Sequence, residues 1–210
     1  MTAQPVSEIP DVPARRPGRL VELNGSLSLQ TLPGRDLHPS ELAELAATIA
    51  AQPDLWEDKV AFSDDERVFA TLHRDANVDV WLICWTPVND TGWHDHDISS
   101  GAVAVARGKL VEHNLAIGVN TIQTEVTAGD VYGFGPDHIH RLTGLDKCSV
   151  TVHAYSPPLW RMGQYSVKDG VLRRLSVSYA DELRPLDYST TVELRATDHW
   201  RSCHDVEPRI

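Results

Sequence analysis

The sequence is short of cysteine, of positive charge and of long apolar runs. Lysine and arginine number 19 against 30 aspartates and glutamates, giving a net charge of −11 at pH 7. This surplus of negative charge argues against a nucleic-acid partner or an anionic membrane surface. No apolar run reaches the roughly 20 residues of a membrane-spanning helix. The 3 cysteines, Cys84, Cys148 and Cys203, are widely spaced and show no metal-ligand pairing.

The first residues also lack the apolar core of a secretory signal. Residues 1–19 are rich in proline and arginine instead, so we expect a flexible lead-in over residues 1–36 and a cytoplasmic location. Residues 37–210 are long enough for one domain with a sizeable core, and no repeat or linker interrupts them. The tail from Leu183 to Ile210 has no clear period, so a wrapped and a loose arrangement both fit it.

One segment, Leu37 to Gln52, has the pattern of an amphipathic helix. Its apolar residues at helical spacing are Leu42, Leu45, Ala46 and Ile49. Ser40 is the predicted N-cap, and Pro53 is expected to end the helix. We expect this helix to pack outside the main body of the fold.

From residue 68 onward, short apolar runs alternate with turn signals, which is typical of an all-β sandwich or barrel. The predicted strands are Val68–His73, Val78–Trp85, Gly101–Arg107, Lys109–Leu115, Thr121–Val126, Val131–Phe134, His140–Thr143, Ser149–Ser156 and Gly163–Val167. Asp169-Gly170 is a hairpin signal before a further run that begins at Val171. Cys84 falls inside an apolar strand, where we expect it to act as a small buried hydrophobe.

Two histidines stand two residues apart in Trp93-His94-Asp95-His96. Because strand side chains alternate between faces, His94 and His96 are expected to point the same way, and Trp93 to point into the core. Two converging imidazoles form half of a site for Fe, Zn, Cu or Ni. A pair of surface histidines is the competing interpretation, because His-x-His alone is common by chance.

The stretch from His94 to Gly108 resembles the first motif of the cupin superfamily. That motif is His-x-His, three or four residues, Glu, six residues and Gly; here His94, His96 and Gly108 match, while Gly101 stands in place of Glu. The resemblance therefore implies histidine ligands without the carboxylate ligand.

The stretch from Gly129 onward resembles the second cupin motif, in which a Gly is followed eleven residues later by a His. Gly129 and His140 fit this spacing. His138 lies on the same strand face as His140, but the spacing favours His140 as the third ligand. Such a three-histidine site keeps coordination positions open and leaves the metal charge uncompensated, which favours an anionic ligand such as a thiolate. Among cupins, the thiol dioxygenases have this arrangement.

A third stretch, Ser149 to Leu159, is similar to the bacterial cysteine dioxygenase signature, in which Ser, His and Tyr alternate before Ser-Pro-Pro. Thr151 stands where the family has Ser, and His153 and Tyr155 follow it on one strand face, able to relay hydrogen bonds. Strand propensity is an equally good explanation of Thr151. The resemblance also implies a cis Ser156-Pro157 bond. Animal members cross-link a cysteine to the tyrosine, but Gly101 stands at that position here, so no such cross-link to Tyr155 is expected.

The resemblance covers roughly residues 60–165. It implies an all-β cupin double-stranded β-helix with a few N-terminal helices and an Fe(II) cofactor. It further implies that the chain oxidises a small thiol of the cysteine or 3-mercaptopropionate type to its sulfinate with O₂. The implied ligands are His94, His96 and His140. His153 would orient Tyr155, whose hydroxyl reaches the substrate or oxygen.

The sequence indicates the residues that bind the substrate less clearly than it indicates the metal ligands. The arginine that binds the substrate carboxylate in cysteine dioxygenases aligns near Phe69, and Arg67 stands two residues before it. Arg161 is another guanidinium able to clamp a carboxylate, although an exposed loop charge explains it equally well. Trp85 is a candidate pocket wall.

Two other functions stay open at this point. One is a cupin oxygenase acting on a different or larger substrate, and the other is a metal-binding or ligand-sensing cupin without turnover. The expected partners are a small thiol and O₂, with no nucleic acid and no membrane. Both a monomer and a small homo-oligomer fit the sequence.

Overall fold

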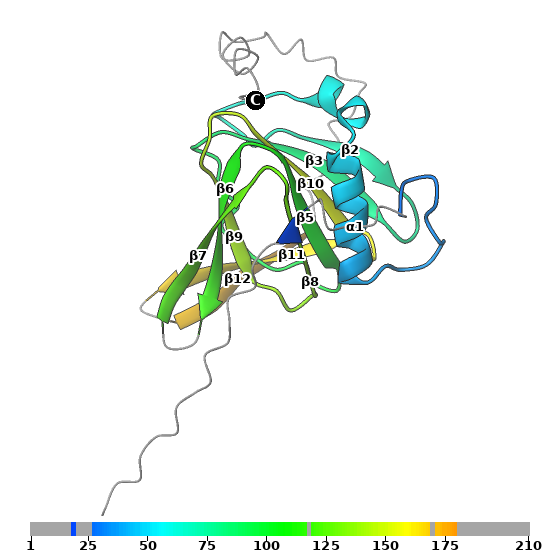
Figure 1. Cartoon of the computed structure of the whole chain (residues 1–210). Helices are drawn as coiled ribbons and strands as arrows, with labels where there is room; N and C mark the ends of the chain where they lie inside the picture. Colours follow the sequence, from blue (N-terminus) through cyan, green and yellow to red (C-terminus); the bar gives the residue numbers. More distant parts are fainter. Residues whose placement is uncertain (1–17, 20–26, 117–118, 169–170, 180–210) are drawn as a thin grey trace, which may run out of the picture.

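Two six-stranded antiparallel sheets and one α-helix make up the part of the chain that the structure describes (Figure 1). The computed structural model describes residues 18–19, 27–116, 119–168 and 171–179. Sheet A contains, in spatial order, β1 (Gly18–Arg19), β8 (Asp130–Phe134), β5 (Ser100–Arg107), β10 (Ser149–Ser156), β3 (Asp79–Trp85) and β2 (Phe69–Arg74). Sheet B contains β12 (Val171–Tyr179), β11 (Arg161–Lys168), β4 (Trp93–His94), β9 (His140–Gly144), β6 (Lys109–Ala116) and β7 (Val119–Thr127).

The fold is a double-stranded β-helix, which confirms the predicted fold class. From β3 onward the chain passes back and forth between the sheets: β3, β5, β8 and β10 lie in sheet A, and β4, the pair β6–β7, β9 and the pair β11–β12 lie in sheet B. The nine predicted strands are all present with ends within two residues of the prediction. β11 and β12 also pair across residues 169–170, at the predicted hairpin, although those two residues lie outside the described part.

Side-chain alternation divides the interior into two apolar cores. In β3, the side chains of Val80, Leu82 and Cys84 join a core that includes the helix. Those of Trp81 and Ile83 join a core with residues of both sheets. β10 has the same alternation, so its odd-numbered side chains face the space between the sheets. Burial on both faces explains why β3 reads as a nearly continuous apolar run. β10 is also buried on both faces, but it carries Thr151, His153 and Tyr155 on its inner face.

Helix α1 (Pro39–Ala50) lies against the outer face of sheet A (Figure 1). It lies within the predicted segment Leu37–Gln52, and its N-cap is His38 rather than Ser40. The reason is local: Pro39 suits the first helical position because it needs no hydrogen-bonded N–H, and Glu41 accepts the His38 N–H at 2.9 Å. After α1 the chain makes two short 3₁₀ turns, η2 (Pro53–Leu55) and η3 (Glu57–Lys59).

Part of the predicted lead-in belongs to the packed structure. β1 pairs with β8, and Leu27, Leu29 and Leu32 pack against the core beneath α1. Residues 1–17 and the tail from residue 180 lie outside the described part, so the division into a lead-in and one domain stays a prediction. Cys84 is a buried free thiol, as expected, and the Ser156–Pro157 bond is cis. In the described residues, no helix is long and apolar enough to cross a membrane.

Candidate metal centre

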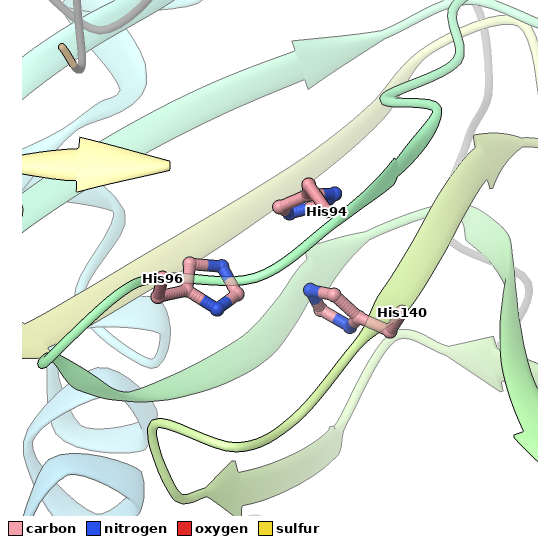
Figure 2. A group of neighbouring side chains, drawn as sticks. All are labelled: His94, His96 and His140. Carbon is pink, nitrogen blue, oxygen red and sulfur yellow. The ribbon is translucent and has the colours of Figure 1, made fainter. Parts of the chain in front are cut away.

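Three histidines from two neighbouring segments converge between the sheets (Figure 2). The rings of His94 and His140 lie 4.7 Å apart between centroids, those of His94 and His96 lie 4.9 Å apart, and those of His96 and His140 lie 5.2 Å apart. One ligand nitrogen from each lies within 4.8 Å of the others. The three side chains are 4%, 1% and 1% exposed, respectively. This is the set that the cupin spacing selects.

Strand β4 carries only the first of the two neighbouring ligands, and His96 follows just beyond its end. β4 ends at His94, which pairs with His140 on one side and Gln164 on the other. The chain then turns at Asp97, whose φ of 53° is positive, and the Ser99 N–H bonds to the His96 carbonyl at 2.9 Å. The expectation that both histidines share a strand is therefore wrong, because the strand stops between them.

Hydrogen-bond partners decide which ring nitrogens are free. The Nδ1–H of His94 donates to the Gly92 carbonyl at 3.1 Å, and the Nδ1–H of His140 donates to Glu112 at 2.9 Å. Both Nε2 atoms therefore carry lone pairs. Among the described residues, neither buried nitrogen of His96 has a partner. Orphaned nitrogens on three converging neutral imidazoles fit a bound metal cation.

Burial also favours the neutral, ligating form of each ring. Desolvation and the neighbouring His140 hold the pKa of His94 well below its ordinary value, and desolvation and His94 do the same for His96. The pKa of His140 is lowered by burial as well. Neutral rings are what a metal needs, because a protonated imidazole has no free lone pair.

The position of the missing carboxylate is filled by an aromatic ring. A Cβ built on Gly101 would collide with the ring of Phe134 and lie 3.0 Å from the ring of Tyr155. Gly101 pairs with Phe134 on β8 and with Tyr155 on β10. A glutamate ligand is therefore excluded sterically at this position, as well as being absent from the sequence.

A carboxylate that sequence reasoning missed lies one hydrogen bond outside the triad. Oε1 of Glu112 accepts from Nδ1 of His140 at 2.9 Å and from Nε2 of His138 at 3.1 Å. The detectable signal is Glu112 itself, a charged residue at an inward position of β6 between Leu110 and Asn114. Its partners are 26 and 28 residues away, which no local pattern reveals.

A hydrogen-bonded relay on β10 faces the triad from sheet A. Oγ1 of Thr151 lies 2.9 Å from Nε2 of His153, and Nδ1 of His153 lies 3.1 Å from the Tyr155 hydroxyl. The Tyr155 ring lies 5.2 Å from the His96 ring. Burial lowers the pKa of His153 to about 3 and raises that of Tyr155, so both groups are neutral at pH 7.

Trp85 extends the relay rather than forming a simple wall. Its indole N–H donates to Oγ1 of Thr151 at 2.8 Å, and its ring stacks on His153 at 6.3 Å. An indole can only donate, so Thr151 accepts there and its own hydrogen is left for Nε2 of His153 or for the Ile83 carbonyl at 3.4 Å. The sequence alone could not assign this contact, since 66 residues separate Trp85 from Thr151.

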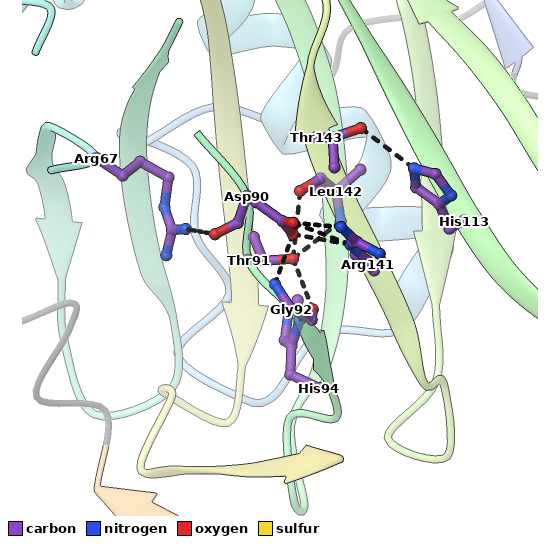
Figure 3. A network of polar contacts seen from close by, with 9 residues as sticks. All are labelled: Arg67, Asp90, Thr91, Gly92, His94, His113, Arg141, Leu142 and Thr143. Atoms are coloured by element: carbon purple, nitrogen blue, oxygen red, sulfur yellow. Dashed lines mark hydrogen bonds and ion pairs between the residues drawn. The ribbon is translucent and has the colours of Figure 1, made fainter. Parts of the chain in front are cut away.

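Arg67 belongs to a polar network that also holds the segment leading into β4 (Figure 3). Its guanidinium lies 5.3 Å from the centroid of the Trp85 ring and donates to the Asp90 carbonyl at 3.3 Å. The Asp90 carboxylate is held in turn by Nε of Arg141 at 2.9 Å and by the Gly92 N–H at 2.8 Å. The positive charge of Arg67 reaches the site, where it lowers the pKa of Tyr155 against the larger effect of burial.

The other predicted substrate residues lie in different surroundings. Phe69 packs edge-on against Trp81, with centroids 5.7 Å apart. Arg161 forms an ion pair with Asp97 at 3.2 Å, at the turn that follows His96. This partner makes Arg161 the weaker candidate for a substrate clamp. Trp93 is only half-buried and packs against His113 at 6.5 Å, so its predicted place in the core is wrong.

Asp95 lies between the ligands His94 and His96 and ties this segment to the C-terminal hairpin. Its buried carboxylate accepts from the Gly163 N–H at 2.9 Å, from the Tyr165 hydroxyl and from Arg174 at 3.3 Å. Burial would raise the pKa of Asp95, but these hydrogen bonds outweigh it and lower the pKa. The ligand segment is thus held from its far side by an ionised carboxylate with several donors.

Comparison with known families gives an independent assignment. The family described as "Cysteine dioxygenase type I" matches residues 17–168. The chain belongs to the cysteine dioxygenase type I family. The match covers every strand except β12, together with the three histidines and the relay. With the histidine triad it indicates a metal cofactor in a cupin related to thiol dioxygenases.

Solved structures of similar shape include several bacterial cupins. A Klebsiella pneumoniae protein with a double-stranded β-helix domain is 16% identical, covers 57% of this chain and 93% of its own, and has a TM-score of 0.43. A Desulfitobacterium hafniense cupin is 10% identical over 49% of this chain and 87% of its own, with a TM-score of 0.42. KdgF from Halomonas sp. is 12% identical, covers 48% of this chain and 87% of its own, and also has a TM-score of 0.42. No curated protein matches the chain.

Proposed function

We propose that this protein is an Fe(II)-dependent thiol dioxygenase that oxidises a small thiol of the cysteine or 3-mercaptopropionate type. The balanced reaction is R–SH + O₂ → R–SO₂H, in which sulfur gains both oxygen atoms and the thiol proton is retained in the sulfinic acid. One observation carries the proposal: three neutral imidazoles without a carboxylate converge opposite a buried tyrosine that is hydrogen-bonded to a histidine. Membership of the cysteine dioxygenase type I family supports it.

His94, His96 and His140 are the proposed ligands. When bound, the iron supplies open coordination positions for an anionic sulfur and for oxygen, together with the redox chemistry of the reaction. The protein itself keeps the ligands neutral and excludes water, since all three side chains are nearly inaccessible. Cytoplasmic location and oligomeric state stay predictions.

Tyr155 is the proposed group at the reacting atoms, with His153 and Thr151 as positioning residues. If Thr151 donates to Nε2 of His153, then Nδ1–H of His153 donates to the Tyr155 oxygen. The phenol hydrogen is then free to donate to substrate or oxygen. The raised pKa of Tyr155 keeps that proton on the phenol at neutral pH.

Arg67 is the proposed partner of the substrate carboxylate. Its guanidinium is oriented by the Asp90 carbonyl and by the face of Trp85, and its field reaches Tyr155. A planar guanidinium held in this way is suited to a carboxylate. Arg161, paired with Asp97, is the competing candidate.

A different or larger substrate is the second candidate function. Phe69 stands near the aligned position of the family arginine and packs on Trp81, which favours a pocket of altered shape. A cupin that binds metal without turnover is the third, although such a protein has no need of a tyrosine–histidine relay facing the triad.

The test is oxygen consumption by anaerobically purified, Fe(II)-loaded protein with cysteine, 3-mercaptopropionate, cysteamine and mercaptosuccinate. We expect uptake with at least one carboxylated thiol and a sulfinate that carries two ¹⁸O atoms from ¹⁸O₂. No uptake with any thiol, despite one bound iron per chain, would favour the second or third candidate. Absence of iron binding would remove the basis of the proposal.

A matched pair of variants tests the carboxylate partner. We expect Arg67→Gln to raise KM for carboxylated thiols about tenfold or more, because a charge-assisted contact is lost, and to leave KM for cysteamine unchanged. Arg161→Gln removes the same charge at the other candidate. An increase confined to Arg161→Gln would assign the carboxylate to that residue instead.

A further inference from the structure

Glu112 is a buried carboxylate that accepts hydrogen bonds from two histidines. Its Oε1 accepts from Nδ1 of His140 at 2.9 Å and from Nε2 of His138 at 3.1 Å. The residue is 7% exposed. Burial of an ionised group costs free energy unless the group is paired and hydrogen-bonded. The two histidine donors supply that pairing for Glu112.

The strand register places Glu112 beside the third ligand. On the paired strands β6 and β9, Asn114 is opposite His140, and Glu112 is opposite Leu142. Leu110, two residues before Glu112, is fully buried in the core between the sheets, so the Glu112 side chain enters the same space. Backbone pairing therefore fixes the carboxylate next to the His140 ring.

The hydrogen bond to Glu112 determines the tautomer of His140. One carboxylate oxygen, Oε1 of Glu112, receives both contacts, from Nδ1 of His140 and from Nε2 of His138. A carboxylate can only accept, so His140 must carry its hydrogen on Nδ1. The lone pair then lies on Nε2, on the side of His94 and His96.

Phe134 connects this carboxylate to the missing ligand. The Phe134 ring fills the space that a side chain at position 101 would need. The same ring stacks on His138, with centroids 4.9 Å apart and an interplanar angle of 26°. One aromatic ring thus excludes a carboxylate among the ligands and supports the histidine that holds Glu112.

We propose that Glu112 is the outer carboxylate of the metal centre, which orients His140 and supplies negative charge without occupying a coordination position. His138 is the second positioning residue, since it holds the shared oxygen of Glu112. This inference rests on the metal centre of the proposed function. It amends the expectation that the charge of the metal is uncompensated: the compensation lies one hydrogen bond outside the ligands and leaves the open positions free.

Three variants test the role of Glu112 in the full-length protein. Glu112→Gln keeps the size and removes the charge, and His138→Leu removes the second donor. Glu125→Gln is the control, an exposed glutamate paired with Lys109 on the neighbouring strand. The measurements are the Kd for Fe(II), from anaerobic competition with a chelator, and the visible spectrum of the Co(II)-loaded protein. Neither readout depends on turnover.

We expect Glu112→Gln to weaken Fe(II) binding about 10- to 100-fold and to shift the Co(II) bands. His138→Leu should have a smaller effect in the same direction, because the His138 side chain is 22% exposed and water can donate to Glu112 in its place. Glu125→Gln should change neither quantity.

Other results would overturn the inference. An unchanged Kd and spectrum in Glu112→Gln, with only a lower unfolding midpoint of the metal-free protein, would make Glu112 a merely structural residue. Two metal ions per wild-type chain, with one lost in His138→Leu, would show that Glu112, His138 and His140 form a metal site of their own. Weakened metal binding in Glu112→Gln, beside a wild-type protein that oxidises no thiol, would overturn the proposed function and support this inference.

Discussion

The two sheets contribute different chemistry to the space between them. Sheet B carries two of the proposed ligands on its strands, His94 on β4 and His140 on β9, with His96 in the turn after β4. Sheet A carries the relay of Thr151, His153 and Tyr155 on β10. The groups proposed to bind a metal and the groups proposed to donate a proton therefore come from opposite sheets.

The buried carboxylates follow the same division. In sheet B, Glu112 and Asp95 each accept several hydrogen bonds, and their pKa values are lowered. In sheet A, neither oxygen of Asp79 has a hydrogen-bond partner among the described residues, and burial raises its pKa to about 6 against the weaker effect of Arg74. Negative charge is stabilised beside the ligands and disfavoured beside the relay. Changes in sheet B should therefore affect metal binding, and changes in sheet A should affect turnover.

The largest effect is expected from removing a ligand. His140→Ala should weaken Fe(II) binding by more than the roughly 100-fold upper range for a partner outside the ligands, and should abolish oxygen uptake. Metal content after dialysis and chelator competition measure it. Retention of one tightly bound iron in this variant would break the assignment of the ligands to sheet B.

The next effect is expected from the end of the relay. Tyr155→Phe keeps the ring and removes the hydroxyl, so kcat should fall about 100-fold or more while the Kd for Fe(II) is unchanged. Oxygen uptake measures kcat and metal titration measures the Kd for Fe(II), both on the same preparation. Loss of metal binding would contradict the division between the sheets, and an unchanged kcat would count against the role of the phenol.

A smaller effect is expected at the start of the relay. Thr151→Val removes the acceptor of the Trp85 N–H and the partner of His153. The loss of one neutral hydrogen bond should lower kcat about tenfold, and the buried indole N–H left without a partner should cost about 1–3 kcal/mol of unfolding free energy. Thr151→Ser is the control, since it keeps the hydroxyl. Equal behaviour of the two variants would reduce Thr151 to a strand residue.

The smallest effect on activity is expected from Asp79→Asn, which should instead change how the stability of the protein depends on pH. Because the pKa of Asp79 is about 6 in the folded protein and 3.8 when exposed, the folded state binds the proton more tightly. Stability from this group is present below pH 4 and is lost as pH rises through 6, a change on the order of 3 kcal/mol.

Urea unfolding at pH 4, 5, 6 and 7 measures this change. The Asn variant should gain stability relative to the wild type as pH rises from 4 to 7. Parallel curves for the two proteins would show that Arg74 already compensates the Asp79 charge, and the electrostatic contrast between the sheets would disappear.

Much of this protein follows from local pattern. The period of 3.6 located α1, and alternation and turn signals located the strands. Motif spacing selected His140 as the third ligand, although His138 lies beside it. Thr151, His153 and Tyr155 share a face because a strand has a period of 2. Such features depend on residues close in sequence, so the sequence by itself determined them.

Tertiary structure decided the rest, because it depends on residues far apart in the chain. The Glu112–His140 hydrogen bond spans 28 residues, the Trp85–Thr151 bond spans 66, and the Arg161–Asp97 pair spans 64. Even the turn after His94 depends on strands β9 and β11 holding β4 from both sides. Spacing identified the residues that carry the chemistry, and packing of the two sheets determined which groups orient, pair and neutralise them.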